Sequence, residues 1–133
     1  MSDPIRVLLI DDEQIFVESL IKVLKRRGIS VQSAHDGSTG VELFAQGEYD
    51  VVVLDMRMPG MDGLATFKAI RDRDSATPVI FLSGHMDIHQ VSQALKDGCA
   101  EVLLKPCPID NLVSCIEDAY ERKCCVLDIA EKT

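Results

Sequence analysis

The sequence predicts an α/β fold: a doubly wound parallel sheet of five strands with helices on both of its faces. Three observations predict it. Five short apolar runs alternate with segments whose apolar residues recur at helical spacing. Glycines stand where the helices would end, and polar residues follow four of the five apolar runs. Strands joined by helices run parallel, and right-handed crossovers place those helices on both faces of the sheet.

The expected strands are short and mostly aliphatic, as suits strands that are buried on both faces. In chain order they are RVLLI (6–10), ISVQSA (29–34), VVVL (51–54), PVIFL (78–82) and EVLL (101–104). The third run ends in a lone carboxylate, Asp55, and a Pro-Gly turn follows at 59–60. We therefore expect Asp55 where this strand leaves the core. The second run is the least apolar and is expected at an edge of the sheet, away from the site.

The segments between the strands carry apolar stripes that are expected to pack on the sheet. The stripes are Phe16, Leu20, Val23, Leu24 and Arg27; Val41, Phe44 and Ala45; Leu64, Phe67 and Ile70; Ile88, Val91, Ala94 and Leu95; and Ile109, Leu112, Val113, Ile116, Ala119 and Tyr120. Gly28, Gly47 and Gly98 mark the expected ends of three helices. The Asp36-Gly37 turn precedes the second helix, with Ser38 as its candidate cap.

Composition restricts the class of protein. The chain has 133 residues, of which 47% are apolar and 27% charged, as in one soluble globular domain. We expect this domain over residues 1–122, with 123–133 as a C-terminal tail or an extension of the last helix. The net charge of -8 argues against direct nucleic-acid binding. Neither a membrane-spanning run nor a secretory leader is recognisable, so a cytoplasmic protein is expected.

The cysteines carry no expected chemistry. There are five of them, at positions 99, 107, 115, 124 and 125, and they show neither a CxxC pair nor a Cys/His metal-ligand spacing. In a cytoplasmic protein such cysteines are expected to stay reduced.

Chemically competent residues collect where the strands end. The first strand is followed by Asp11 and Asp12, the third by Asp55, the fourth by Ser83 and the fifth by Lys105. With strand order 2-1-3-4-5, the first and third strands lie about 4.8 Å apart, so the three carboxylates would crowd together. Such crowding opposes joint ionisation, and Mg²⁺ would relieve it. The alternative, in which each aspartate only caps a helix or turn, leaves the shared edge unexplained.

Four motifs carry a resemblance to a known family: LLIDDE, VVVLDMRMPGMDG, PVIFLSG and LLKP. Over about residues 4–122 the chain resembles a receiver domain of the two-component response-regulator family, and it is similar to stand-alone chemotaxis-type receivers. The resemblance implies a flavodoxin-like (βα)5 fold. It also implies a signalling role without a separate enzyme activity. A phosphoryl group would pass from the phosphohistidine of a sensor histidine kinase or phosphotransfer protein to Asp55, and a protein-interaction face would then switch.

The resemblance also implies the roles of the other site residues. Mg²⁺ (or Mn²⁺) would be held by Asp11, Asp12, Asp55 and the backbone carbonyl of Arg57. Lys105 and Ser83 would donate hydrogen bonds to the oxygens of the phosphoryl group. The family pattern further implies a cis peptide between Lys105 and Pro106.

One position departs from the family pattern. Val102 stands three residues before the lysine, where most members carry the Tyr or Phe that changes rotamer on activation. Coupling through an aromatic side chain is therefore in question, whereas the phosphorylation chemistry should survive. Arg57 and His85 stand where the family tunes the loss of phosphate, and the simpler interpretation of His85 is a solvated loop histidine.

Other functions compete with this interpretation. A flavodoxin-type cofactor module shares the topology but would need a hydroxyl- and glycine-rich phosphate cradle after the first strand. An aspartate-nucleophile hydrolase would need a cap over its substrate. A receiver-like interaction module that is no longer phosphorylated would not need the complete acid, serine and lysine set. The partner downstream is expected to be either a separate protein or an output domain joined to this one in a longer chain. This chain itself is expected to contact neither nucleic acid nor membrane.

Overall fold

Five parallel strands form one central sheet in the order β2-β1-β3-β4-β5, as the sequence predicts. The computed structural model describes the backbone of residues 3–132 and the side chains of residues 3–124. The strands are β1 Arg6–Ile10, β2 Ser30–Ala34, β3 Val51–Leu54, β4 Val79–Ser83 and β5 Glu101–Leu104. Their bounds agree with the expected ones to within one residue at each end.

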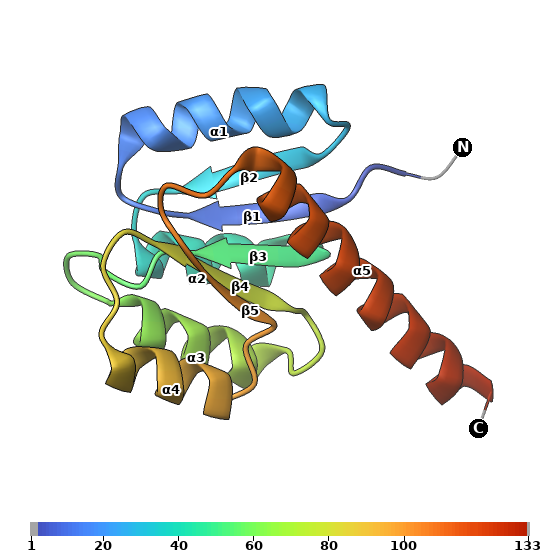
Figure 1. Ribbon diagram of the computed structural model, residues 1–133. Helices are drawn as coiled ribbons and strands as arrows, with labels where there is room; N and C mark the ends of the chain where they lie inside the picture. The colour runs from blue at the N-terminus through green and yellow to red at the C-terminus, as the bar shows by residue number, and fades with distance from the viewer. Residues whose placement is uncertain (1–2, 133) are drawn as a thin grey trace.

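Helices cover both faces of this sheet (Figure 1). They are α1 Gln14–Arg26, α2 Gly37–Gln46, α3 Gly63–Arg73, α4 Ile88–Lys96 and α5 Ile109–Lys132. The side chains of α1 and α5 pack on one face of the sheet, and those of α2, α3 and α4 pack on the other. In Figure 1 the C-terminal half of α5 runs well past the ends of the strands.

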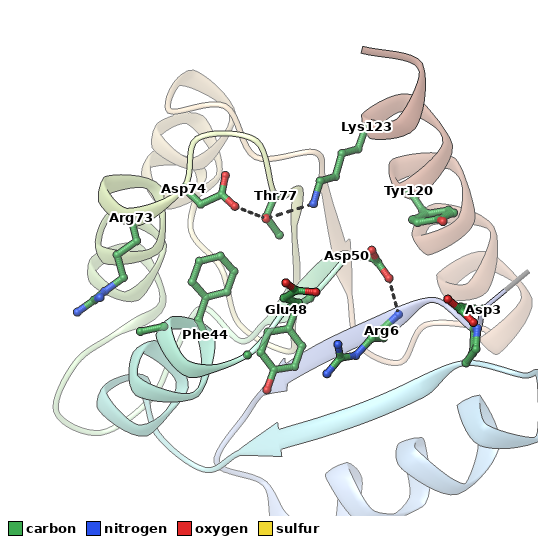
Figure 2. Close-up of a pocket in the computed structure, with 14 residues that line it drawn as sticks. Asp3, Arg6, Phe44, Glu48, Asp50, Arg73, Asp74, Thr77, Tyr120 and Lys123 are labelled. Carbon is green, nitrogen blue, oxygen red and sulfur yellow. Dashed lines mark hydrogen bonds between the residues drawn. The ribbon is translucent and has the colours of Figure 1, made fainter. Parts of the chain in front are cut away.

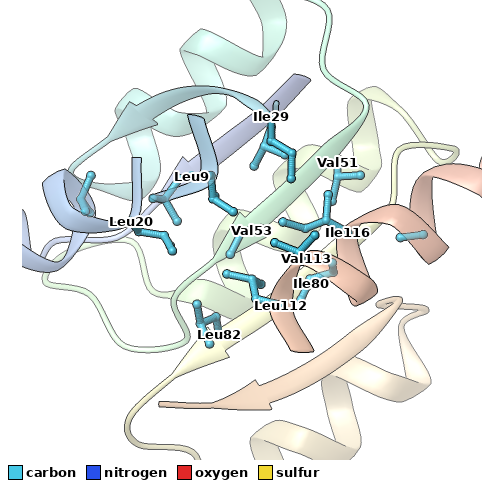
Figure 3. Close-up of a cluster of buried hydrophobic side chains, with 14 residues drawn as sticks. Leu9, Leu20, Ile29, Val51, Val53, Ile80, Leu82, Leu112, Val113 and Ile116 are labelled. Carbon is cyan, nitrogen blue, oxygen red and sulfur yellow. The ribbon is translucent and has the colours of Figure 1, made fainter. Parts of the chain in front are cut away.

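The strands have a hydrophobic cluster on each face because successive side chains point to opposite sides. Val51 and Val53 of β3 join the cluster beneath α1 and α5, which Figure 3 shows. Val52 and Leu54 join the cluster on the α2, α3 and α4 side. All four side chains are at most 1% exposed, so β3 is held rigidly at the centre of the molecule.

The prediction that every apolar stripe faces the sheet is wrong for α4. Ile88 is 74% exposed and Leu95 54% exposed, whereas Ala94 is fully buried against the sheet. The helix has only nine residues and lies at the β5 edge, where less of the sheet is available to cover it. In α2, Ala45 is likewise exposed.

The predicted cap of α2 is also wrong. Asp36, and not Ser38, is the N-cap: its backbone is extended, and its carboxylate accepts a 2.7 Å hydrogen bond from the amide of Thr39. Ser38 lies exposed inside the helix. An aspartate three residues before a free amide is a strong cap, which explains the choice.

The remaining expectations concern cysteines and membranes. Four cysteines, at 99, 107, 115 and 124, carry free thiols. The side chain of Cys125 lies outside the described residues. Over residues 3–132, none of the helices combines the length and the apolar character that crossing a bilayer requires.

Candidate functional site at the carboxyl ends of the strands

Strand pairing brings the acidic residues of two distant segments together. Ile10 of β1 lies opposite Leu54 of β3 in the parallel ladder. The next residue of each strand is an aspartate, and the amide of Asp55 donates to the carbonyl of Ile10 at 2.9 Å. Asp11 is hydrogen-bonded to the strand on its other side, β2, because its amide donates to the carbonyl of Ala34. The backbone therefore fixes both carboxylates at one edge of the sheet.

The structure brings the three predicted carboxylates into one cluster. Oxygen atoms of Asp11, Asp12 and Asp55 lie within 4.8 Å of one another. Asp11 is 1% exposed and Asp55 is 4% exposed, whereas Asp12 is open to solvent. Carboxylate oxygens are the hard ligands that Mg²⁺ prefers, so this donor set fits such an ion with room on the solvent side.

Burial dominates the ionisation of this cluster. It raises the pKa of Asp11, and the nearby Asp55 carboxylate raises it further, against the opposing hydrogen bonds from Lys105 and the amide of Glu13. Burial likewise raises the pKa of Asp55, although the Ser83 hydroxyl stabilises the charged form. Ionising Asp11 and Asp55 is therefore unfavourable in the free cluster, and a bound cation would make it favourable.

Lys105 forms its ion pair with Asp11 and not with Asp55. Its Nζ is 2.7 Å from Oδ2 of Asp11 and 3.0 Å from Oε1 of Glu13, and its side chain is only 12% exposed. The ammonium also sits over the ring of Phe16, 4.1 Å from the centroid. Burial disfavours the charge, but the hydrogen bonds to the two carboxylates prevail, and the pKa of Lys105 is raised.

Glu13 and Phe16 are neighbours of the lysine that the sequence did not single out. Glu13 directly follows the acidic pair, and this is the one signal that could have pointed to it. The helical spacing of apolar residues predicts Phe16 only as a residue that packs on the sheet. Its second role depends on the position of a lysine far along the chain, which no local pattern reveals.

Ser83 is hydrogen-bonded directly to Asp55. Its hydroxyl donates to Oδ1 of Asp55 at 2.7 Å, and it also lies 3.3 Å from the carbonyl of His85. The amide of Arg57 approaches the same carboxylate oxygen at 3.4 Å. The side chains of Arg57 and His85 are exposed.

The loop after Asp55 is closely packed against the start of α3. A Cβ atom on Gly63 would collide with the carbonyl oxygen of Asp55 and stand 2.6 Å from Cα of Met56. Only glycine fits here, which explains its position directly after the Asp62 cap. The peptide between Lys105 and Pro106 is cis, as the family pattern implies.

Comparisons with known proteins agree with this geometry. The family model of the response regulator receiver domain matches residues 7–117. The regulatory protein AtoC of Escherichia coli is 32% identical over 116 residues, which are 87% of this chain and 25% of AtoC. DctD, a C4-dicarboxylate transport transcriptional regulatory protein of Rhizobium meliloti, is 34% identical over 96% of this chain and 28% of its own length. The chain therefore spans about a quarter of these relatives.

Solved structures show the same fold. A response regulator receiver domain protein from Clostridium thermocellum superposes with a TM-score of 0.87 at 31% identity, covering 92% of this chain and 98% of that one. The structure named FixJ-N superposes with a TM-score of 0.82 at 28% identity, covering 91% and 96%.

Proposed function

Because this chain belongs to the response regulator receiver domain family, whose function is phosphoryl acceptance, we propose that Asp55 is its acceptor. The donor would be the phosphohistidine of a sensor histidine kinase or of a phosphotransfer protein. The convergence of Asp11, Asp12 and Asp55 at one edge of the sheet, with Ser83 and Lys105 beside them, is the observation that carries this proposal.

The chemistry proposed for Asp55 is nucleophilic. One of its carboxylate oxygens attacks phosphorus, the bond between phosphorus and the histidine nitrogen breaks, and the imidazole leaves with the electron pair. The product is an acyl phosphate. Such a transfer depends on in-line positioning and on neutralised charge more than on an acid or base. The nearly inaccessible β3 strand supports the first requirement, because it leaves Asp55 little freedom to move.

The metal site proposed here uses Asp11, Asp12, Asp55 and the backbone carbonyl of Arg57. When bound, Mg²⁺ (or Mn²⁺) supplies the positive charge that offsets the carboxylates and the incoming phosphoryl oxygens. The mixed exposure of the cluster supports this assignment. Asp11 and Asp55 are fixed and buried, whereas Asp12 faces solvent and leaves a side open for the phosphoryl group.

Lys105 and Ser83 are proposed to stabilise the transferred group. The lysine would exchange part of its contact with Asp11 and Glu13 for a phosphoryl oxygen, and the serine would turn its hydroxyl from Asp55 to another oxygen. Both side chains already lie at the cluster, which keeps the required movement small. The same set of groups would serve the loss of phosphate to water, so no separate enzyme activity is assigned.

Signal output is proposed to use the surface formed by α4, β5 and α5. Ile88 and Leu95 of α4 and Leu104 of β5 expose more than half of their surface, which supports a protein-binding role. Val102, half-buried beside Phe81 of the neighbouring strand, replaces the usual aromatic switch. Movement of the loop between Ser83 and α4 would then carry the signal.

We assign residues 1–122 to the receiver domain, which the match over residues 7–117 supports. AtoC and DctD are about four times as long as the region that this chain matches, which supports two arrangements: the partner downstream is either a separate protein or an output domain in one chain with this receiver. In either arrangement we place the receiver in the cytoplasm, where a histidine kinase would present its phosphohistidine.

The deciding experiment is phosphorylation by a small phosphodonor. The protein is incubated with acetyl phosphate and Mg²⁺ and weighed intact by mass spectrometry. We expect a gain of one phosphoryl mass, lost on treatment with hydroxylamine as an acyl phosphate should be, and strongly reduced when EDTA removes the metal.

The matched variants are Asp55→Asn and Asp72→Asn. Both remove one carboxylate, but Asp72 lies exposed on α3, away from the cluster. We expect no gain of mass in the first variant and a normal gain in the second. Equal labelling of Asp55→Asn and the unchanged protein would show that the acceptor lies elsewhere.

A further inference from the structure

A small pocket lies at the amino ends of the strands, at the opposite end of the sheet from the acidic cluster. It is lined by the loops that lead into β4 and β5 and by α5, it is open to solvent, and its volume is about 300 Å³. Ala76, Pro78 and Ala119 contribute apolar walls. The size is at the lower end of the range of small-molecule sites, which fits a compact ligand.

The charge of this pocket is opposite to that of the chain. Arg71, Arg122 and Lys123 line it, and none of its lining residues is acidic. The whole chain has 22 acidic and only 14 basic residues, so a pocket lined by three cations and no carboxylate departs from the charge balance of the chain. Charge-assisted hydrogen bonds from such groups favour an anion.

Arg71 is the most informative of the three cations. Arg71 is half-buried, and its guanidinium donates to the backbone carbonyls of Thr77 at 2.5 Å, Asp74 at 3.4 Å and Gly98 at 3.5 Å. Among the described side chains, no carboxylate comes within 4.0 Å of it. Burial lowers the pKa of Arg71, while Asp74 partly restores it from a distance. A half-buried cation that lacks an ionic partner is stabilised by an anion that reaches it.

Lys123 connects this pocket to a larger neighbouring cavity of about 770 Å³, shown in Figure 2. Figure 2 shows Lys123 reaching from α5 toward Thr77, whose hydroxyl lies 3.5 Å from its Nζ. The larger cavity is lined by cations and also by acids, among them Asp50 and Asp74. Its charges oppose one another, so the smaller pocket is the better anion site.

We propose that the pocket between α5 and the loops before β4 and β5 binds a small organic anion. The ligand would carry carboxylate or phosphate groups, which the three cations would contact, on a short body that packs against Ala76, Pro78 and Ala119. This site is separate from the acceptor aspartate and does not depend on phosphorylation.

The test is an NMR titration of the ¹⁵N-labelled full chain in metal-free buffer at constant ionic strength. The two probes are sodium citrate and sodium glycerol phosphate, with sodium chloride as the reference salt. We expect saturable shifts at the amides of residues 75–76, 98–100 and 119–123 with at least one probe. The more potent probe then shows whether carboxylate or phosphate is preferred. Shifts that stay linear, or that chloride reproduces, would overturn the proposal.

Matched double variants separate a built site from general attraction. Arg122→Gln with Lys123→Gln should weaken binding about tenfold or more, because two charge-assisted contacts are lost. Lys22→Gln with Lys25→Gln removes the same charge from exposed positions of α1 and should leave the affinity unchanged. Equal weakening by both pairs, or by neither, would show that the pocket does not bind the anion. The Asp55→Asn chain should bind as well as the unchanged one.

Discussion

The two ends of the central sheet differ in charge although they belong to the same strands. At the carboxyl end, Asp11, Asp12 and Asp55 converge. At the amino end, the smaller pocket is lined by cations and contains no acid. A net charge of -8 describes neither end. Local burial and hydrogen bonding, more than overall composition, decide which ions a surface can accept.

The same residue type behaves differently at the two ends. Burial raises the pKa of Asp55 at the carboxyl end. The pKa of Asp74, near the amino end, is lowered, chiefly because the amide of Ala76 donates to its carboxylate at 2.7 Å. One aspartate therefore strains the fold when it ionises, and the other stabilises it.

Glycine substitutions should cost more at the carboxyl end than at the amino end. Gly63→Ala drives a Cβ into the backbone of Asp55 and Met56, and we expect a loss of about 3 kcal/mol in unfolding free energy. Gly98→Ala meets no atom within 4 Å and suffers only from its positive φ of 91°, so about 1 kcal/mol is expected. Urea denaturation of both variants measures the difference. Equal losses would mean that the loop after β3 is not closely packed.

The loss of stability on removing a cation from α3 should depend on how far that cation is buried. Arg71→Met removes the donor to the Thr77 carbonyl and the contact with the ring of Phe67, 4.9 Å away, so a loss of about 2 kcal/mol is expected. Arg73→Met changes the same charge at an exposed position and should alter stability by less than about 0.5 kcal/mol. Thermal and urea unfolding report both values, and similar losses would refute the structural role of Arg71.

The pH dependence of stability should be opposite for Asp55→Asn and Asp74→Asn in metal-free buffer. The folded pKa of Asp55 is raised, so its ionisation destabilises the fold as pH rises above about 4. Asp55→Asn should therefore be more stable than the unchanged protein by about 1 kcal/mol at pH 7. This advantage should shrink toward pH 4.

For Asp74 the sign is reversed. Its folded pKa is lowered, so the stability that its charge provides is present above about pH 4 and is lost as pH falls through the folded pKa. Asp74→Asn should cost about 1 kcal/mol at pH 7 and almost nothing at low pH. Urea denaturation at several pH values measures both curves. A parallel response of the two variants would contradict the difference between the ends.

Much of this protein was predictable because its signals are local. Each strand is a short apolar run, and Asp55 stands where such a run meets a turn. The predictions that failed required knowledge of neighbours. Ile88 and Leu95 have the spacing of buried residues, but α4 lies at an edge that cannot cover them. Ser38 is an acceptable cap in isolation, and Asp36 is simply a better one.

The order of the strands and helices, the family, and the side chains that stand at the strand ends all follow from the amino-acid sequence. That Lys105 contacts Asp11, 94 positions away, and lies over the ring of Phe16 depends on the tertiary structure. It alone gathered Arg71, Arg122 and Lys123 around one pocket. The physical reason is that periodicity and turns act between residues close in the chain, whereas burial and ionic partners are set by segments that meet only on folding.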